Sequence, residues 1–541
     1  MIFIVAPCTS RKASDLVSAA FSRSVTRSQV MQVGSGRLMQ RLQRDIIVAI
    51  NPDQEISDHL VQMTKSNDRM KIVLFGALTD RLMKIIGARS REWPEQLSRT
   101  AFSDKAQPRL QAESTARIRY AESASRLGAT SWNRPLERFD FGDEWNNMGY
   151  GAIRVDSSDW AVSSPVEIDS DCLLATVMSD EFDGIAYSAI KDLDYQSILW
   201  FNRANGPIDS FEWRIIENFI SNWRSKDLPC VPVVKEIPYG FDSCITMRLD
   251  CDEDIESARE LRSEYIRLDI PFSLAIHSKL LANTTQHALI KEMVDRGESI
   301  LSHSATHSSN WGGSYQAAIS EARISAQTIR DVTGVYPKYA VSPFHQTPSF
   351  ALRALSDSGY LGCIGGSISC NPEFNLARGG ELAGLPAMFV GHSQQHMLHG
   401  DCMLQGSDPL AISKQAFMLA KATSTLFGYL DHPFSERYTY GWSDEATRID
   451  AHRNLVLFIK ASTKKPLFLS EDKALDFLVY KSKIRIADLD QNYRFNLQDN
   501  FNSTGYDVAI EYQGDTFKAI DGLILAKLNT DSYASDPRRL T

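Results

Sequence analysis

The sequence predicts an α/β protein of several domains, and three observations support this: its length, its composition, and its alternation of apolar runs with amphipathic segments. A chain of 541 residues exceeds what one hydrophobic core organises, so more than one domain is expected. Hydrophobic residues make up 43% and aromatic residues 10%, which excludes disordered, collagen-like and coiled-coil architectures. We expect a Rossmann-like α/β domain over residues 1–235, a (β/α) barrel over 236–482 and a small β appendage over 483–541.

Charge and targeting signals narrow the classes of partner. The 58 basic and 67 acidic residues give a net charge of −9, and no basic run marks a nucleic-acid surface, so no nucleic-acid partner is expected. No stretch has the roughly 18 apolar residues that a membrane-spanning helix requires. The apolar run Ile2–Ala6 precedes Arg11 and Lys12, the reverse of a secretory signal, which predicts a cytoplasmic protein. The eight scattered cysteines fit reduced thiols.

The first 235 residues predict a parallel sheet covered by helices. Apolar runs of strand length alternate with helical patterns. The expected strands are Ile2–Ala6, Ile46–Ile50, Ile72–Phe75 and Ile198–Phe201, and the expected helices include Ser57–Thr64 and Glu212–Trp223. Several prolines after position 228 predict the end of this domain. Three roles stay open for it: packing on the barrel, shaping its groove, or binding a nucleotide.

A second and more regular alternation of strands and helices follows. The expected strands are Cys244–Asp250, Phe272–Ile276, Ser299–Ser302, Tyr339–Ser342, Leu361–Gly365, Ala387–Gly391 and Gly428–Asp431. The expected helices are Asp254–Arg267, His287–Arg296, Tyr315–Val332, Ser349–Ser358, Leu410–Ser424 and Asp444–Ser462. About seven strands alternating with helices predict a closed or nearly closed (β/α) barrel. Short alternating runs after residue 484 predict the β appendage, packed on the barrel.

The first barrel strand carries charged residues on one face. Because side chains alternate along a strand, Arg248, Asp250 and Asp252 point to the same side, near the carboxyl end of the strand. Two carboxylates and a guanidinium therefore converge at the mouth of the predicted barrel. Helix capping is the alternative role for Asp252 and Asp254, since both precede a helix. Capping does not explain Arg248 and Asp250.

Two histidines follow another short strand of the barrel. His303 and His307 are four residues apart, a spacing that places two imidazoles on one side of a helical turn. With Asp252 as a third ligand, they would hold a metal ion. Two partly exposed polar histidines are the alternative interpretation.

These motifs together resemble the polysaccharide deacetylase superfamily, also called the NodB-homology or carbohydrate esterase family four group. The resemblance covers roughly residues 240–482. The motifs occur in family order at Arg248–Asp252, His303–His307, Val341–His345 and Leu430–His432. The resemblance implies a distorted (β/α)7-type deacetylase barrel, preceded by the Rossmann-like domain and followed by the appendage.

The resemblance also implies a role for each site residue. Asp252, His303 and His307 would bind one divalent metal, Zn²⁺ first, with Mn²⁺, Co²⁺ and Ni²⁺ as alternatives. Asp250 would be the general base that takes a proton from water, and His432 the general acid that protonates the departing amine. The backbone N–H of Phe344 would help hold the oxyanion.

One position departs from the family pattern. The arginine that usually opens the third motif is absent, because the chain has Val341 and Ser342 before Pro343. We hypothesise that Arg248 takes over its task, holding Asp250 and lowering the pKa of that carboxyl by charge proximity.

A further set of residues is expected to contact the substrate. His392, His396 and His399 would form a polar groove wall or orient His432, and a second metal site is the alternative. Arg437 would bind an anionic group, and Tyr438 and Trp442 would stack on sugar rings, with core packing as the alternative. His345 is expected to face the pocket.

The predicted function is a metal-dependent amide hydrolase that removes an N-acyl group, acetyl or formyl, from an amino sugar. A cytoplasmic address favours a nucleotide-linked or lipid-linked sugar of surface polysaccharide biosynthesis, such as O-antigen or capsule. Two alternatives stay open: a metal-dependent hydrolase of a non-sugar C–N bond, and a catalytically silent carbohydrate-binding protein. No oligomeric state is predicted.

Overall fold

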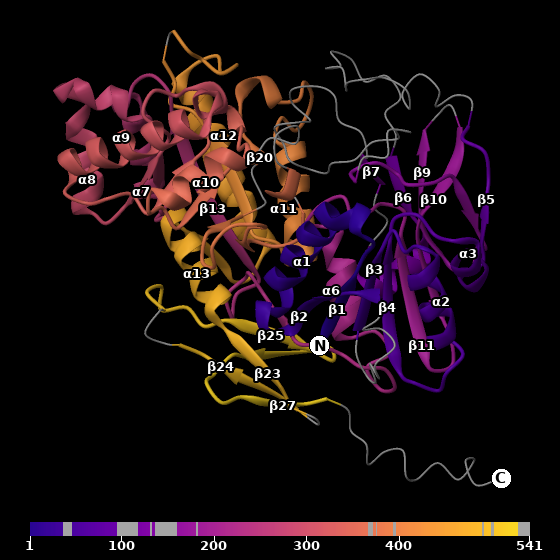
Figure 1. Ribbon diagram of the computed structural model, residues 1–541. Coiled ribbons are helices and arrows are strands. Elements are labelled where there is room, and N and C mark those ends of the chain that lie inside the picture. The colour runs from indigo at the N-terminus through magenta and orange to yellow at the C-terminus, as the bar shows by residue number, and fades with distance from the viewer. Residues whose placement is uncertain are drawn as a thin grey trace.

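The computed structural model (Figure 1) describes residues 1–35, 46–94, 117–129, 133–135, 159–179, 182–365, 372–374, 376–392, 396–435, 437–489, 492–498 and 502–527. In the view of Figure 1 the first 235 residues lie on the right, the barrel strands and their helices on the left, and the C-terminal strands below. Among the helices of the described ranges, none is both long and apolar enough to span a bilayer.

The first sheet has nine strands in the order β2-β1-β3-β4-β11-β10-β9-β6-β7. They are β1 Ile2–Val5, β2 Val30–Val33, β3 Ile46–Ile50, β4 Met70–Phe75, β6 Arg117–Tyr120, β7 Asn133–Pro135, β9 Leu173–Ser179, β10 Phe182–Asp192 and β11 Gln196–Phe201. Strands β2 to β11 of that order pair in parallel, as predicted. The remaining strands pair antiparallel, so the Rossmann-like prediction covers only one half of the sheet. The direction reverses because only residues 193–195 connect β10 to β11, too few for a parallel crossover.

Helices cover both faces of this sheet. They are α1 Arg11–Val25, α2 Gln54–Met63, α3 Asp80–Ile86 and α6 Trp213–Ser221, and a two-stranded sheet of β5 Ala88–Ser90 and β8 Val166–Ile168 lies beside them. Along β3, alternate side chains enter two separate apolar cores: one contains residues of α1 and α6, the other residues of α2 and α3. A strand buried on both faces needs apolar residues at every position, which explains the unbroken run Ile46–Ile50.

The barrel sheet has the strand order β18-β19-β17-β16-β15-β14-β13-β21-β20, with β22 paired to β13. Its strands are β13 Ser243–Cys251, β14 Ser273–Ile276, β15 Ser299–Ser302, β16 Tyr339–Val341, β17 Gly362–Ile364, β18 Gly380–Glu381, β19 Val390–Gly391, β20 His396–Met397, β21 Phe427–Asp431 and β22 Pro466–Leu469. From β19 to β20 all pairings are parallel. In the described part of the chain β18 and β20 end the order without pairing to each other, so the sheet is open rather than a closed barrel.

Helices follow the barrel strands, and all but α13, which was not predicted, lie within a few residues of the predicted positions. They are α7 Arg259–Arg267, α8 His287–Asp295, α9 Tyr315–Thr333, α10 Ser349–Asp357, α11 Ala411–Thr423, α12 Glu445–Ser462 and α13 Glu471–Lys483. Local signals fix the ends of the longest of them. Ser314 accepts a hydrogen bond from the Ala317 N–H at the start of α9, and Gly334 ends that helix in the left-handed conformation.

The C-terminal strands form two small sheets, and this region packs on the first domain as well as on the barrel, where Tyr506 lies against the core that contains Cys244 and Leu467. One sheet contains β23 Arg485–Leu489, β24 Asn492–Asn496 and β27 Ile524–Ala526; the other contains β12 Val233–Val234, β25 Ala509–Tyr512 and β26 Asp515–Lys518. Tyr493, Phe495 and Tyr512 lie in the same apolar core as Ile4 and Trp213 of the first domain. The appendage joins that core because β12, which precedes the barrel, pairs with β25.

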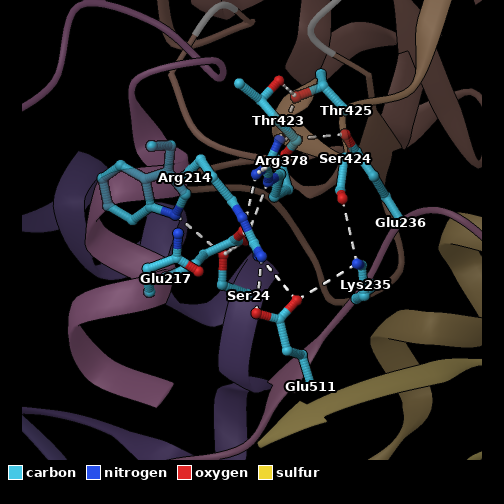
Figure 2. A network of polar contacts seen from close by, with 12 residues as sticks. Ser24, Arg214, Glu217, Lys235, Glu236, Arg378, Thr423, Ser424, Thr425 and Glu511 are labelled. Carbon is cyan, nitrogen blue, oxygen red and sulfur yellow. Dashed lines mark hydrogen bonds and ion pairs between the residues drawn. The ribbon is translucent and has the colours of Figure 1, made fainter. Parts of the chain in front are cut away.

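A buried network of charges connects the three regions (Figure 2). Arg378, which precedes β18, donates two hydrogen bonds of 3.0 and 2.7 Å to Glu217 of α6 and lies 3.9 Å from Glu236. Arg214 of α6 forms a bidentate pair of 2.9 and 2.7 Å with Glu511 of β25. Burial raises the pKa of Glu217, but Arg378 and Arg214 lower it to about 2, so this carboxylate is ionised.

Replacing Arg378 by Met should destabilise the whole protein. The change leaves Glu217 buried without its main partner, and losing one member of a buried pair costs about 3–5 kcal/mol. Urea unfolding of the two proteins measures the difference in the free energy of unfolding. The control is Arg81→Met, which removes an exposed pair with Asp58 and should cost less than about 1 kcal/mol. Equal costs for the two variants would contradict the prediction.

Candidate metal centre

The carboxyl ends of four parallel strands bring the candidate residues to one edge of the sheet. Asp252, His277, His303 and His432 are the first residues after β13, β14, β15 and β21, respectively. Because parallel strands end on the same side, their following residues lie side by side.

Asp252, His303 and His307 place three potential ligand atoms around one point. Asp252 Oδ1 lies 3.5 Å from His303 Nε2 and 3.2 Å from His307 Nε2. Ligands of a tetrahedral ion bound at about 2.0–2.2 Å would lie about 3.3–3.6 Å apart. Asp252 Oδ1 is also buried and makes no hydrogen bond to any described residue. This donor set therefore fits a small divalent cation.

Neighbouring backbone groups orient these ligands. The Nδ1 atom of His303 lies 3.0 Å from the Val341 carbonyl oxygen, which directs Nε2 toward Asp252. His277, which was not among the sequence candidates, places Nε2 2.6 Å from the carbonyl oxygen of Asp252. His277 directly follows a parallel strand, as Asp252, His303 and His432 do, and this shared position is the sequence signal that could have identified it.

The path from His303 to His307 corrects one detail of the prediction. These residues form a loop rather than a helical turn, because Ser304 and His307 have positive φ angles of 66° and 56°. The Ser304 hydroxyl accepts a hydrogen bond of 3.0 Å from the His307 N–H. The two imidazole centroids still lie 4.8 Å apart.

Asp250 and Arg248 form a buried pair beside these ligands. The Nε atom of Arg248 donates to one oxygen of Asp250 at 2.7 Å, and Nη2 donates to the other at 3.2 Å. Burial raises the pKa of Asp250, but the Arg248 guanidinium, together with His303 and His432, holds it well below its usual range. This geometry is what we expect if Arg248 takes the place of the arginine that is absent from the third family motif.

His432 lies near Oδ2 of Asp252, whereas His303 and His307 lie near Oδ1. Its Nε2 atom is 3.5 Å from Asp252 Oδ2, and its Nδ1 atom is 2.7 Å from Nε2 of His399. The ring of Tyr440 stacks on His432 at 4.1 Å, and the Tyr440 hydroxyl donates to Asp252 at 3.2 Å. Of the three histidines His392, His396 and His399, it is thus His399 that contacts the site.

Asp431 supports this side from the protein interior. Its carboxylate accepts a hydrogen bond of 3.1 Å from the Trp442 indole and lies 3.0 Å from His452 Nε2. Arg448 lies 3.7 Å from the same carboxylate and donates to the His432 carbonyl oxygen at 2.7 Å. His399, Asp431 and His432 are also close enough together to form a second ligand group. The charge of Asp431 is, however, already balanced by Arg448 and His452, which disfavours an ion at that place.

The other sequence candidates divide into exposed and buried groups. Arg437 and Tyr438 are exposed, and the guanidinium lies 5.3 Å from the tyrosine ring. Phe344 is 43% exposed, and its ring centroid is 4.5 Å from that of His307. His345 is buried, which lowers its pKa well below the usual value.

Three candidates are buried without contact to the ligand group. His392 lies 3.0 Å from Glu471, His396 lies 2.8 Å from the Ser413 hydroxyl and stacks on Phe427, and Trp442 is 3% exposed. For Trp442 this arrangement favours the packing interpretation over stacking on a sugar.

Comparison with known proteins identifies a family for part of the barrel. Residues 268–362 match the family model described as polysaccharide deacetylase, which confirms the resemblance inferred from the motifs. This segment includes His303, His307 and Phe344, whereas Asp250 and His432 lie outside it. No curated protein sequence matches the chain.

Solved structures of carbohydrate deacetylases and esterases are similar at low identity. Agd3, described as a novel carbohydrate deacetylase, matches over 98% of both chains with 10% identity and a TM-score of 0.41. The Xyl-CE4 domain of a multidomain xylanase from the hindgut metagenome of Trinervitermes trinervoides covers 43% of this chain and 90% of its own, with 12% identity and a TM-score of 0.30. A family 4 acetyl xylan esterase from Clostridium thermocellum covers 43% and 90%, with 13% identity and a TM-score of 0.28.

The candidate centre predicts binding of one divalent ion per chain. After removal of metal by a chelator and dialysis against Zn²⁺, the wild type should retain one equivalent by elemental analysis. The variants Asp252→Ala and His303→Ala should each lower the affinity at least about tenfold, because each removes a ligand. His59→Ala, far away in α2, serves as the control. Equal metal content in all four proteins would show that these residues do not form the site.

Proposed function

We propose that the protein is a metal-dependent hydrolase that removes an N-acyl group, acetyl or formyl, from an amino sugar. The observation that carries the proposal is the convergence of Asp252, His303 and His307 around one point, with the Asp250–Arg248 pair and His432 nearby. The family match to residues 268–362 supports carbohydrate deacetylation.

The metal would be held by Asp252, His303 and His307. A divalent ion in such a site supplies a Lewis acid that polarises a carbonyl group and lowers the pKa of water. The residues around it would supply the proton transfers that amide hydrolysis requires.

Asp250 is suited to take a proton from the attacking water. Its carboxylate is ionised and held in one orientation by two hydrogen bonds from Arg248. A base fixed in this way stays aligned with its target, which is the main requirement for general base catalysis.

His432 is suited to protonate the amine that leaves. Its Nε2 atom faces Asp252, while its Nδ1 atom is engaged by His399 at 2.7 Å. Stacking on Tyr440 holds the plane of the ring. Both proton-transfer groups would thus lie near the ligand group, where the substrate amide would bind.

The substrate would enter from the side on which Phe344, Arg437 and Tyr438 are exposed. An aromatic ring stacks on a sugar face, and a guanidinium binds a phosphate or a carboxylate. We include in the proposal a nucleotide-linked or lipid-linked amino sugar, and a place in the cytoplasmic synthesis of a surface polysaccharide.

The Zn²⁺-loaded protein should release amine from at least one member of a panel of N-acetylated and N-formylated amino sugars, free and nucleotide-linked. Asp250→Asn should lower kcat by at least about 100-fold with unchanged metal content, because the general base is lost. Amine release is followed with a primary-amine reagent. Failure on every sugar, with release from a simple non-sugar amide, would contradict the sugar part of the proposal.

Arg248→Lys and Arg248→Met should also lower turnover while metal content is retained. Lysine cannot form the bidentate pair with Asp250, and methionine removes the charge as well, so Met should have the larger effect. Steady-state kinetics and elemental analysis measure both quantities. Wild-type turnover in either variant would exclude Arg248 as the substitute for the family arginine.

A further inference from the structure

A second carboxylate contacts Arg248 from the side opposite Asp250. Glu471 is the first residue of α13, and its side chain is fully buried. Its Oε1 atom lies 3.6 Å from Arg248 Nη1, and its Oε2 atom lies 3.0 Å from His392 Nε2. The sequence motifs gave no indication of this residue.

Helix capping does not explain the position of Glu471. The other free N–H groups in the first turn of α13 have different acceptors: the Asp472 N–H donates to the Ser299 hydroxyl at 3.4 Å, and the Lys473 N–H donates to Asp472 Oδ1 at 2.9 Å. The backbone N–H of Glu471 donates to the Ser273 hydroxyl at 3.0 Å, while its carboxylate points inward to Arg248. A buried carboxylate is costly without charged partners, and Arg248 and His392 are the partners of Glu471. These contacts indicate a role for Glu471 other than helix capping.

Glu471 and Asp250 hold Arg248 from two sides. The guanidinium is planar, and its Nε and Nη2 atoms donate to Asp250 while Nη1 faces Glu471. The contact with Glu471 is an ion pair without a hydrogen bond, so in this low-dielectric interior its charge attracts the Nη1 end of the guanidinium while Asp250 binds the other edge. The Arg248 side chain is 1% exposed, so water does not replace a lost partner easily.

We propose that Glu471 is a positioning residue that acts on Asp250 through Arg248. This inference rests on the proposed function, in which Asp250 is the general base. Glu471 contacts neither the ligand group nor the exposed side from which substrate would enter. Its effect is to hold the guanidinium in the orientation that aligns the Asp250 carboxylate with the attacking water.

The test compares Glu471→Gln with the control Asp476→Asn. Glutamine keeps the size of the side chain and a hydrogen bond to His392 but removes the charge that faces Arg248. Asp476 is on the same helix and contacts Lys338 and Tyr339 instead, so it matches the change in chemistry without contact to the base. Both variants are made in the full-length, Zn²⁺-loaded protein.

Glu471→Gln should lower kcat about 10- to 100-fold and leave KM and metal content unchanged, because only the alignment of the base is affected. Asp476→Asn should retain kcat within about twofold. If Glu471→Gln does not fold, Glu471→Asp is tested instead. This variant keeps the charge on a shorter side chain, so its kcat should fall by less than the loss expected for glutamine. Wild-type kcat in the folded Glu471 variant would overturn the inference.

A double-mutant cycle separates positioning from a general structural role. If Glu471 acts through Arg248, adding Glu471→Gln to Arg248→Met should change kcat by no more than about twofold beyond Arg248→Met alone. Effects that multiply would show that Glu471 acts independently and would overturn the inference.

A structural measurement distinguishes failure of this inference from failure of the proposed function. If the wild type releases no amine from any substrate, the proposed function fails, and crystal structures of the wild type and Glu471→Gln then decide the inference alone. A changed orientation of the Arg248 guanidinium and Asp250 carboxylate supports it; an unchanged orientation overturns it.

Discussion

The alignment of the parallel barrel strands is the constraint on which the candidate centre depends. Cys251 of β13 pairs with Ile276 of β14, which in turn pairs with Ser302 of β15. The residues that follow, Asp252, His277 and His303, are therefore level with one another. On the other side of β13, Leu249 pairs with Asp431, which places His432 level with Asp250. A shift of one residue in any pairing would turn these side chains to the other face of the sheet.

Much of the barrel and of the ligand group could be predicted from the sequence, because both depend on local patterns. Apolar periodicity located most of the strands and helices, and the spacing of His303 and His307, together with Asp252 at the end of the first strand, predicted that these three side chains would lie together. The antiparallel half of the first sheet was missed, since hydrophobicity alone does not show the direction of a strand. Glu471 was missed for a different reason: it lies more than 200 residues from Arg248 in the sequence, and only the packing of α13 brings the two together.

Two of the buried charge clusters differ in their surroundings. At the junction of the three regions, Glu217 and Arg378 are paired with each other and further supported by Arg214, Thr423 and Thr425 (Figure 2). Beside the candidate centre, Arg248 is shared between two carboxylates. Paired charges in the interior add little net stability compared with apolar packing, but they penalise any arrangement in which a partner is missing. Both sets therefore favour one relative placement of their elements.

Helix α13 links these two places. It begins at Glu471 beside Arg248, and further along it Phe477 and Tyr480 lie in the core that the first domain shares with the C-terminal strands. On another face, Leu475 and Leu478 pack against barrel strands. The barrel is consequently not a self-contained unit: cutting it out of the chain would expose one side of the helix that begins beside Arg248. Divergence of such a protein is expected to proceed by changing loops at the sheet edge rather than by exchanging whole domains.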